Sequence, residues 1–263
     1  MNTTKRQPKS QRQPPRGRLS VALAALLFAL LFSPLAKADA MKFADIKIGS
    51  VISEQIELPQ LFGTHYFPLP PGDWVVQAID ADKSPGGIRT DSYYLTLTNQ
   101  DPTAKMPVIS VGPSLKTSGW NFRGCGTVDP AHGWYYVSGA DMPTFPNEGK
   151  CANLQNVGKV TESRIDSKIK AVANSLRWTS VWKTVAAQPK LLDGKDIQKV
   201  NFNTAPWGGH WFDMAVYVEL KKSDVAPENV VEPAVLNWIH LTADLLTQAA
   251  EGKKVTLTAF PAF

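Results

Sequence analysis

The side chains that most often carry acid–base or metal chemistry are sparse and scattered in this sequence. Of its four histidines, only two lie three residues from an aspartate: His132 follows Asp129, and His210 precedes Asp213. In an extended strand, residues three apart point to opposite faces, so His210 and Asp213 are not expected to act together. Asp129 and His132 fall in a glycine-rich stretch where they could converge, but two ligands do not make a metal site.

Recognised catalytic motifs do not occur in the chain. We find no phosphate loop, dinucleotide fingerprint, nucleophile elbow or zinc-protease helix. The sequence therefore favours a protein that is not an enzyme and that has no cofactor or metal. The alternative is a periplasmic hydrolase whose site lies around Asp129 and His132.

Aromatic side chains are a stronger indication of function, because they gather in two glycine-rich stretches, residues 120–136 and 207–212. Tryptophan and tyrosine on loops can stack on sugar rings or anchor a protein partner. The alternative is that they cover a core whose loops hold few other large side chains. The candidate binding residues are Trp120, Trp134, Tyr136, Trp207, His210 and Trp211.

Two cysteines, Cys125 and Cys151, lie 26 positions apart in the glycine- and proline-rich region of residues 101–158. In an oxidising compartment an even number of cysteines predicts a disulfide. Such a bridge would stabilise the fold by roughly 3–4 kcal/mol in the chain-entropy model. The alternative is that Cys125 is a reactive thiol.

The first 40 residues have the order of parts of a secretory signal peptide. A basic start is followed by an apolar run from Leu19 to Leu35, and the segment closes with Ala38-Asp39-Ala40. It holds seven of the 28 basic residues and one of the 23 acidic residues, which leaves 21 basic and 22 acidic residues in the remainder. Because the excess positive charge lies in the segment that we expect to be removed, we exclude nucleic-acid binding.

These features predict a periplasmic or secreted protein, with residues 1–40 as signal peptide and residues 41–263 as one exported domain. The apolar run is short for the roughly 20 residues that cross a bilayer, so no membrane span is expected after cleavage. The alternative is an uncleaved anchor in the inner membrane. The oligomeric state does not follow from the sequence.

Hydrophobic periodicity divides the exported domain into a β-rich part (41–158) and a helix-strand-strand-helix part (159–263). Alternation predicts strands over 50–58, 73–79 and 88–98, which would pair as an antiparallel meander. Residues 101–158 are expected to be mostly irregular, with short strands at 106–111 and 133–137.

The second part begins and ends with a predicted helix. Apolar residues at helical spacing predict helices over 165–177 and 233–250, and the second has proline in its first turn and glycine after its end. Strands are expected near 200–202, at 212–220 and at 255–259. The fold class that follows is α+β, an antiparallel sheet of a meander and a C-terminal hairpin with both helices packed on one face.

Several of these segments resemble a group of exported proteobacterial proteins of unknown function. The resemblance lies in Leu69-Pro-Pro-Gly-Asp-Trp74, in the cysteine pair, in the strand from Gly209 to Tyr217, and in a C-terminal helix that carries Trp238. It implies export and a shared architecture, and no catalytic residue comes with it. The sequence thus predicts a non-enzymatic binding or accessory protein of the cell envelope, whose partner is an envelope glycan or a protein.

Overall fold

The computed structural model describes residues 40–59, 64–82, 92–117, 134–139, 150–206, 210–220 and 232–261. The chain divides into two units, Met1–Ala38 and Asp39–Phe263. The first unit lies outside the described residues, so the signal peptide stays a prediction. Among the described residues, no helix combines the length and the apolar character that crossing a bilayer requires.

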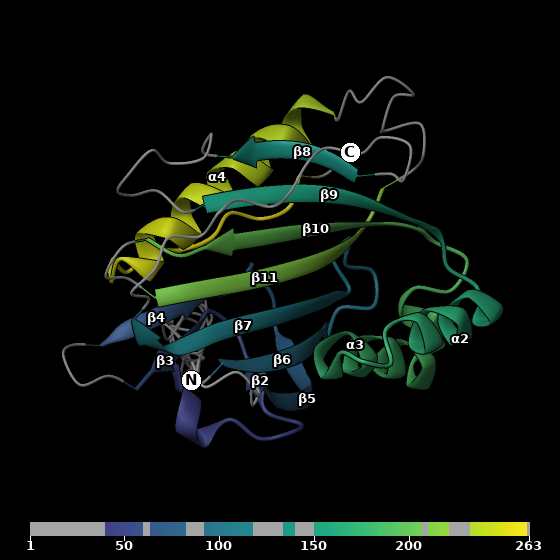
Figure 1. Ribbon diagram of the computed structural model, residues 1–263, viewed down its shortest axis with the longest axis horizontal. Coiled ribbons are helices and arrows are strands. Elements are labelled where there is room, and N and C mark those ends of the chain that lie inside the picture. The colour runs from purple at the N-terminus through teal and green to yellow at the C-terminus, as the bar shows by residue number, and fades with distance from the viewer. Residues whose placement is uncertain are drawn as a thin grey trace, which may run out of the picture. The chain divides into compact units, whose positions relative to one another are not determined.

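An antiparallel sheet of eight strands forms the centre of the second unit, in the order β2-β5-β6-β7-β11-β10-β9-β8 (Figure 1). The predicted meander is present as β5-β6-β7 and the predicted hairpin as β10-β11, and pairing of β7 with β11 joins the two. The strands are β2 (Val51–Ile52), β5 (Trp74–Asp82), β6 (Ser92–Asn99), β7 (Val108–Thr117), β8 (Trp134–Gly139), β9 (Lys150–Lys159), β10 (Asp196–Thr204) and β11 (His210–Glu219).

A second, smaller sheet contains β1 (Met41–Lys42), β3 (Gln55–Leu58) and β4 (His65–Pro68), with β1 parallel and β4 antiparallel to β3. The predicted strand over 50–58 is therefore two strands, which belong to different sheets. Short 3-10 helices occur at η1 (Phe43–Asp45) and η3 (Pro189–Leu191). The α-helices are α2 (Glu162–Ala171), α3 (Leu176–Ala187) and α4 (Pro233–Ala250).

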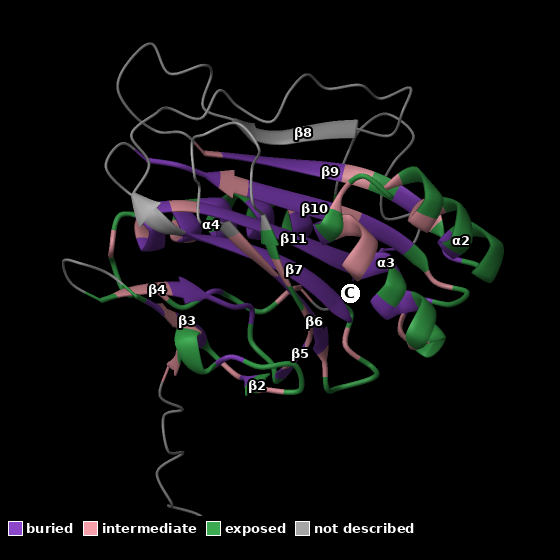
Figure 2. Ribbon diagram, turned by 60° about the horizontal axis from the view of Figure 1, so that its bottom comes forward, coloured by how far each residue is buried: buried purple, intermediate pink, exposed green. Residues whose placement is uncertain are grey.

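The α+β class is confirmed, but the prediction that the helices share one face of the sheet is wrong. Helix α4 lies against β8 to β11 and β4, whereas α3 lies against β5, β6 and β7. Strand β11 shows that these are opposite faces: Phe212 and its alternate residues pack with α4, and Tyr217 packs with Trp182 of α3. A sheet covered on one face would leave Asp213 and Tyr217, which alternate with the apolar residues of β11, in solvent, but both are buried. Figure 2 shows the central strands of the sheet largely buried.

The core on the α4 side is the larger of the two. The small sheet packs over it beside α4, and Phe67 of β4 meets Phe212 with ring centres 4.8 Å apart. Helix α4 has the predicted bounds, begins with Pro233 and is followed by Gly252 at a positive φ of 92°. The predicted strand at 255–259 is not a strand: this segment runs beside α4, where Thr258 accepts a hydrogen bond from the Trp238 indole.

The predicted helix over 165–177 is two helices. Helix α2 ends at Ala171, and α3 starts after Ser175, whose hydroxyl accepts a hydrogen bond from the Trp178 N–H. Serine is favoured at this N-cap position because its oxygen satisfies an otherwise unpaired backbone donor. The break changes the helical phase, and as a result Arg177 faces the sheet.

Strand β9 lies within the stretch that we expected to be irregular. Its alternation is weak, because only Ala152 and Leu154 face the α4 core and a bulge near Gly158 then shifts the register. Cys151 is buried on this strand. Cys125 lies outside the described residues, so the disulfide stays a prediction.

Candidate functional site

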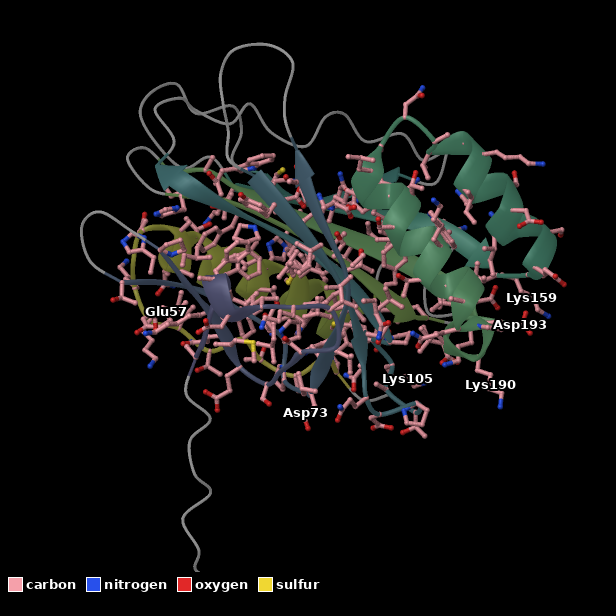
Figure 3. All side chains as sticks on the ribbon, turned by 90° about the horizontal axis from the view of Figure 1, so that it is seen from below. Glu57, Asp73, Lys105, Lys159, Lys190 and Asp193 are labelled. Carbon is pink, nitrogen blue, oxygen red and sulfur yellow. The ribbon has the colours of Figure 1, made fainter. Side chains whose placement is uncertain are left out.

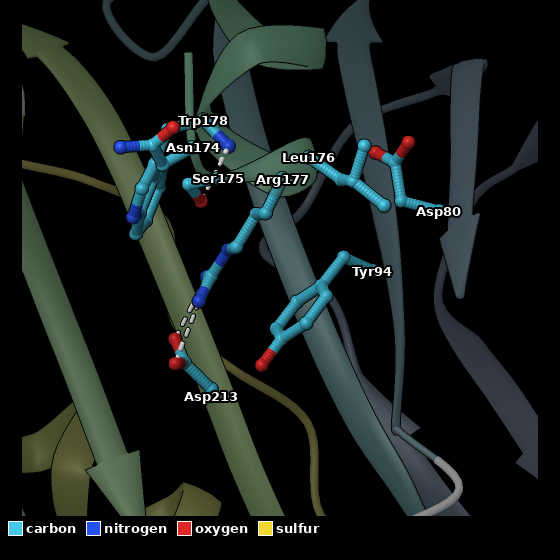
Figure 4. Close-up of a pocket in the computed structure, with 8 residues that line it drawn as sticks. All are labelled: Asp80, Tyr94, Asn174, Ser175, Leu176, Arg177, Trp178 and Asp213. Carbon is cyan, nitrogen blue, oxygen red and sulfur yellow. Dashed lines mark hydrogen bonds and ion pairs between the residues drawn. The ribbon is translucent and has the colours of Figure 1, made fainter. Parts of the chain in front are cut away.

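A cleft of about 450 Å³ opens between the start of α3 and the sheet (Figure 4). It lies on the face opposite α4. Residues from β5, β6, β11, α3 and the turn before α3 line it, so it depends on the packing of α3 on the sheet. The lining residues are Asp80, Tyr94, Asn174, Ser175, Leu176, Arg177, Trp178 and Asp213.

The base of the cleft is a buried ion pair between Arg177 and Asp213. The two guanidinium nitrogens Nη1 and Nη2 donate to the carboxylate oxygens Oδ2 and Oδ1 at 2.6 and 2.7 Å. The same guanidinium donates from Nε to the Ser110 hydroxyl at 2.8 Å and from Nη2 to the Ser110 carbonyl at 3.2 Å. Both side chains are nearly inaccessible to solvent. The bidentate pair with Asp213 therefore holds α3 on β11, and the hydrogen bonds to Ser110 hold it on β7.

Aromatic rings stand on both sides of the guanidinium. Its central carbon lies 4.1 Å from the centre of the Trp178 ring and 4.6 Å from that of Tyr94, and Figure 4 shows the arginine running between them. The Tyr94 ring also rests on Gly112, the residue opposite Asp213 in the register of β7 and β11. A Cβ at position 112 would lie 2.6 Å from a Tyr94 ring carbon, so only glycine leaves the ring in place.

Polar groups complete the rim. Asp80 accepts a hydrogen bond from the Ser180 hydroxyl at 3.0 Å through Oδ1. Its Oδ2 is buried and has no hydrogen-bond partner in the described part of the chain. Burial raises the pKa of this carboxyl, against the opposing effects of the Ser180 hydrogen bond and the Lys183 charge. Asn174 is exposed on the turn before α3.

Lys199 of β10 lies behind Trp178, with its ammonium 3.6 Å from the ring centre. The pKa of this lysine is lowered to about 7, mainly by burial and also by the charges on Arg177 and Lys168, against the opposing effect of Asp213. The Trp178 ring therefore contacts two cations.

Of the predicted binding residues, His210 lies in the core. Its ring is buried on β11, hydrogen-bonded to the Ser114 carbonyl, and its centre is 4.7 Å from that of His65. Burial lowers the pKa of both histidines. Asp213 points to the opposite face, so the expectation that these neighbours do not act together is confirmed. The prediction that His210 belongs to an exposed aromatic loop is wrong, because its ring is buried at the first residue of β11.

The other predicted residues give less information. Trp211 is half-buried on β11, and its indole nitrogen is buried with no hydrogen-bond partner in the residues that the structure describes. Trp134 and Tyr136 belong to β8, opposite Gln155 and Asn153 of β9. Outside the described residues lie Trp120, Trp207, Asp129 and His132.

The cleft was not predicted from the sequence. Arg177 was the last residue of a single predicted helix, Trp178 lay outside that helix, and Tyr94 fell in a predicted strand without a functional role. A signal was present, since an arginine that faces the interior needs a buried anion, and Asp213 is a charged residue within the most regular strand.

Comparisons with known proteins add no relative. The chain matches no protein-family model, no curated protein and no solved structure. The resemblance to exported proteobacterial proteins therefore stays a prediction. Within the described ranges, no three His, Cys, Asp or Glu side chains are close enough together to hold a metal ion.

Proposed function

We propose that this chain is an exported, non-enzymatic binding protein of the cell envelope, and that the cleft beside α3 holds a saccharide unit of an envelope glycan. The single observation that carries the proposal is the cleft itself. It combines two aromatic rings with planar polar side chains in a volume that suits a small ligand.

The polar groups of the cleft suit a ligand rich in hydroxyl and amide groups. Asp80 offers a buried carboxylate oxygen without a partner in the described chain, and Asn174 offers both a donor and acceptors. A guanidinium has five N–H donors, and Arg177 gives four of them to Asp213 and Ser110. One N–H on Nη1 is left without an acceptor among the described residues.

The fixed geometry of the site supports binding rather than catalysis. Both carboxylate oxygens of Asp213 already accept hydrogen bonds from Arg177, so this pair is committed to holding the fold. A rigid base with few rotatable groups lowers the entropy that binding costs.

A binding assay with matched variants tests the proposal. Purified residues 41–263 should bind isolated peptidoglycan or saccharides on a bacterial glycan array. Trp178→Ala should weaken this binding about tenfold because it removes one wall of the cleft, and Asn174→Ala by roughly threefold through one lost hydrogen bond. Tyr66→Ala removes an aromatic ring on the small sheet, away from the cleft, and should leave the affinity unchanged.

Two results would contradict the proposal. The first is that no glycan binds under these conditions. The second is that Tyr66→Ala and Trp178→Ala weaken binding equally, which would mean that loss of stability and not loss of the cleft causes the effect. Thermal melts of each variant separate these causes.

Export and the disulfide form a separate part of the proposal. The supporting observations are the basic and apolar leader, the Ala38-Asp39-Ala40 ending, and the even number of cysteines. Protein recovered from the periplasm or medium should have a mass that begins at Met41 and is two hydrogens lower than that of the reduced chain. Recovery of full-length chain from the cytosol with two free thiols would overturn this part.

A further inference from the structure

A second cavity, of about 370 Å³, lies where three segments of the chain meet. These segments are the turn between β2 and β3, the turn before β5, and the C-terminal segment that follows α4. The volume is in the range of small-ligand pockets. The cavity shares no lining residue with the cleft beside α3. Its lining residues are Ser53, Glu54, Gln55, Leu69, Pro71, Gly72, Asp73 and Thr256.

Side-chain hydrogen bonds join these three segments. The Ser53 hydroxyl donates to Asp73 Oδ1 at 2.7 Å, which connects the two turns. The side-chain nitrogen of Gln55 donates to the Val255 carbonyl, which connects β3 to the C-terminal segment. Because Ser53 and Gln55 spend donors on these bonds, the side-chain groups that they leave for a ligand are mainly acceptors.

Three acceptors of the cavity keep unused lone pairs. Gln55 is only 5% exposed, and its amide oxygen has no hydrogen-bond partner in the described chain. The second carboxylate oxygen of Asp73 and the carboxylate of Glu54 also lack a partner among the residues that the structure describes. A polar group held in the interior without a partner costs free energy, so a ligand that supplies N–H groups would stabilise this arrangement.

The lining of the cavity is negatively charged, since it contains two carboxylates and no basic side chain. The lysines of the adjoining C-terminal segment have other contacts. Lys253 donates to a carboxylate oxygen of Glu251 at 3.1 Å, and the Lys254 ammonium lies 4.9 Å from the centre of the Tyr66 ring. In the described part of the chain, no ion pair therefore neutralises the two carboxylates of the cavity.

Apolar side chains complete the lining. Leu69 and Pro71 contribute hydrocarbon beside the acceptors. A calcium ion needs about six to eight oxygen ligands and gains nothing from such a wall. An alkyl chain that ends in an ammonium group uses both parts of the cavity, and its three N–H donors equal the unused acceptors in number.

We infer that this cavity binds a small primary alkylamine, with its ammonium group held by Glu54, Gln55 and Asp73 and its alkyl chain against the apolar wall. Hydrogen bonds between an ammonium and carboxylates are charge-assisted, so these bonds supply most of the affinity. The sequence motif from Leu69 to Trp74 contributes one of the carboxylates and the apolar wall. The inference does not depend on which ligand the cleft beside α3 holds.

A titration of residues 41–263 with n-pentylamine near pH 7, followed by backbone amide shifts, tests the inference. Saturable shifts are expected at residues 53–55 and 72–73. Tetramethylammonium carries the same charge but has no N–H donor, and n-pentanol has the alkyl chain without the charge. Each should bind at least about tenfold more weakly than the amine, because each lacks the charge-assisted hydrogen bonds.

Two variants make the test specific. Glu54→Gln changes an exposed carboxylate, so it should weaken amine binding about tenfold and leave the melting temperature unchanged. Glu57→Gln is the matched control, because Glu57 lies three residues farther along the chain and does not line the cavity. Figure 3 shows Glu57 well apart from Asp73 on the surface. This variant should bind the amine as the unmodified chain does.

The inference is overturned if n-pentylamine gives no saturable shifts, or if tetramethylammonium binds equally well, which would show screening of the carboxylates alone. Equal losses in Glu54→Gln and Glu57→Gln would overturn it as well. Calcium chloride in a further arm should leave residues 53–55 and 72–73 unchanged, and shifts there with calcium but not with the amine would assign a metal site instead. The titration of the unmodified chain gives a result even if a variant folds poorly.

Discussion

Replacing Asp213 by alanine is expected to lower the free energy of unfolding by about 3–5 kcal/mol, because it leaves the buried Arg177 guanidinium without its anion. The guanidinium would lose both of its hydrogen bonds to the carboxylate, and Ser110 cannot replace them. Since this pair fixes α3 to the sheet, the cleft should also lose its shape. Urea unfolding followed by circular dichroism measures the change.

A second ion pair provides the control. Lys150 and Asp244 are also 2.6 Å apart, but the Asp244 side chain is 52% exposed. Asp244→Ala should therefore cost less than about 1 kcal/mol. The double variant Arg177→Met with Asp213→Leu should recover most of the stability, because it removes both buried charges. A loss in Asp213→Ala no larger than that in Asp244→Ala would show that the pair does not hold α3.

Replacing Trp74 by alanine is expected to cost about 3–5 kcal/mol, as for other fully buried aromatic side chains. Trp74 begins β5, is inaccessible to solvent, and packs in the larger core. Its indole N–H donates to the Pro70 carbonyl at 2.7 Å, which closes the turn before the strand. Gly72 in this turn has a φ of 134°, a conformation that favours glycine.

A graded series separates packing from the hydrogen bond. Trp74→Phe keeps most of the ring volume but leaves the Pro70 carbonyl without its donor, so it should cost roughly 1–3 kcal/mol. The motif Leu69-Pro-Pro-Gly-Asp-Trp74 is then a folding element, and Trp74→Phe should leave glycan binding unchanged. Weaker binding by a well-folded Trp74→Phe would assign this turn to the site instead.

The elements with a strong and regular pattern could be predicted from the sequence. Helix α4 has apolar residues on one face, proline in its first turn and glycine after its end, and its predicted bounds match. Strand β11 alternates clearly, and the hairpin with β10 follows from their proximity in the chain. Local chemistry determines these features.

The features that the sequence did not predict correctly depend on tertiary contacts. Strand β9 has small or polar side chains at most positions, and neighbours on both sides hold it in the sheet. The placement of the helices on opposite faces depends on Tyr217, whose burial against Trp182 is not visible in a pattern that also contains Asp213 and Glu219. A sheet buried on both faces does not show simple alternation.

The cleft could not be predicted because its residues are far apart in the sequence. Asp80 and Asp213 are separated by most of the exported domain, and only the pairing of β7 with β11 brings their strands into one sheet. Of the candidates that we selected from composition, His210 is buried on the face opposite the cleft, and Trp211 is half-buried on β11. Clustering in sequence identified aromatic content but not the location of the site.

The most direct test of the account is a map of backbone amide shifts in residues 41–263 on addition of a soluble peptidoglycan disaccharide. The account predicts that the largest shifts occur at Asp80, Tyr94 and the segment from Asn174 to Trp178. Shifts confined to the small sheet and α4, or no shifts at saturating disaccharide, would contradict it.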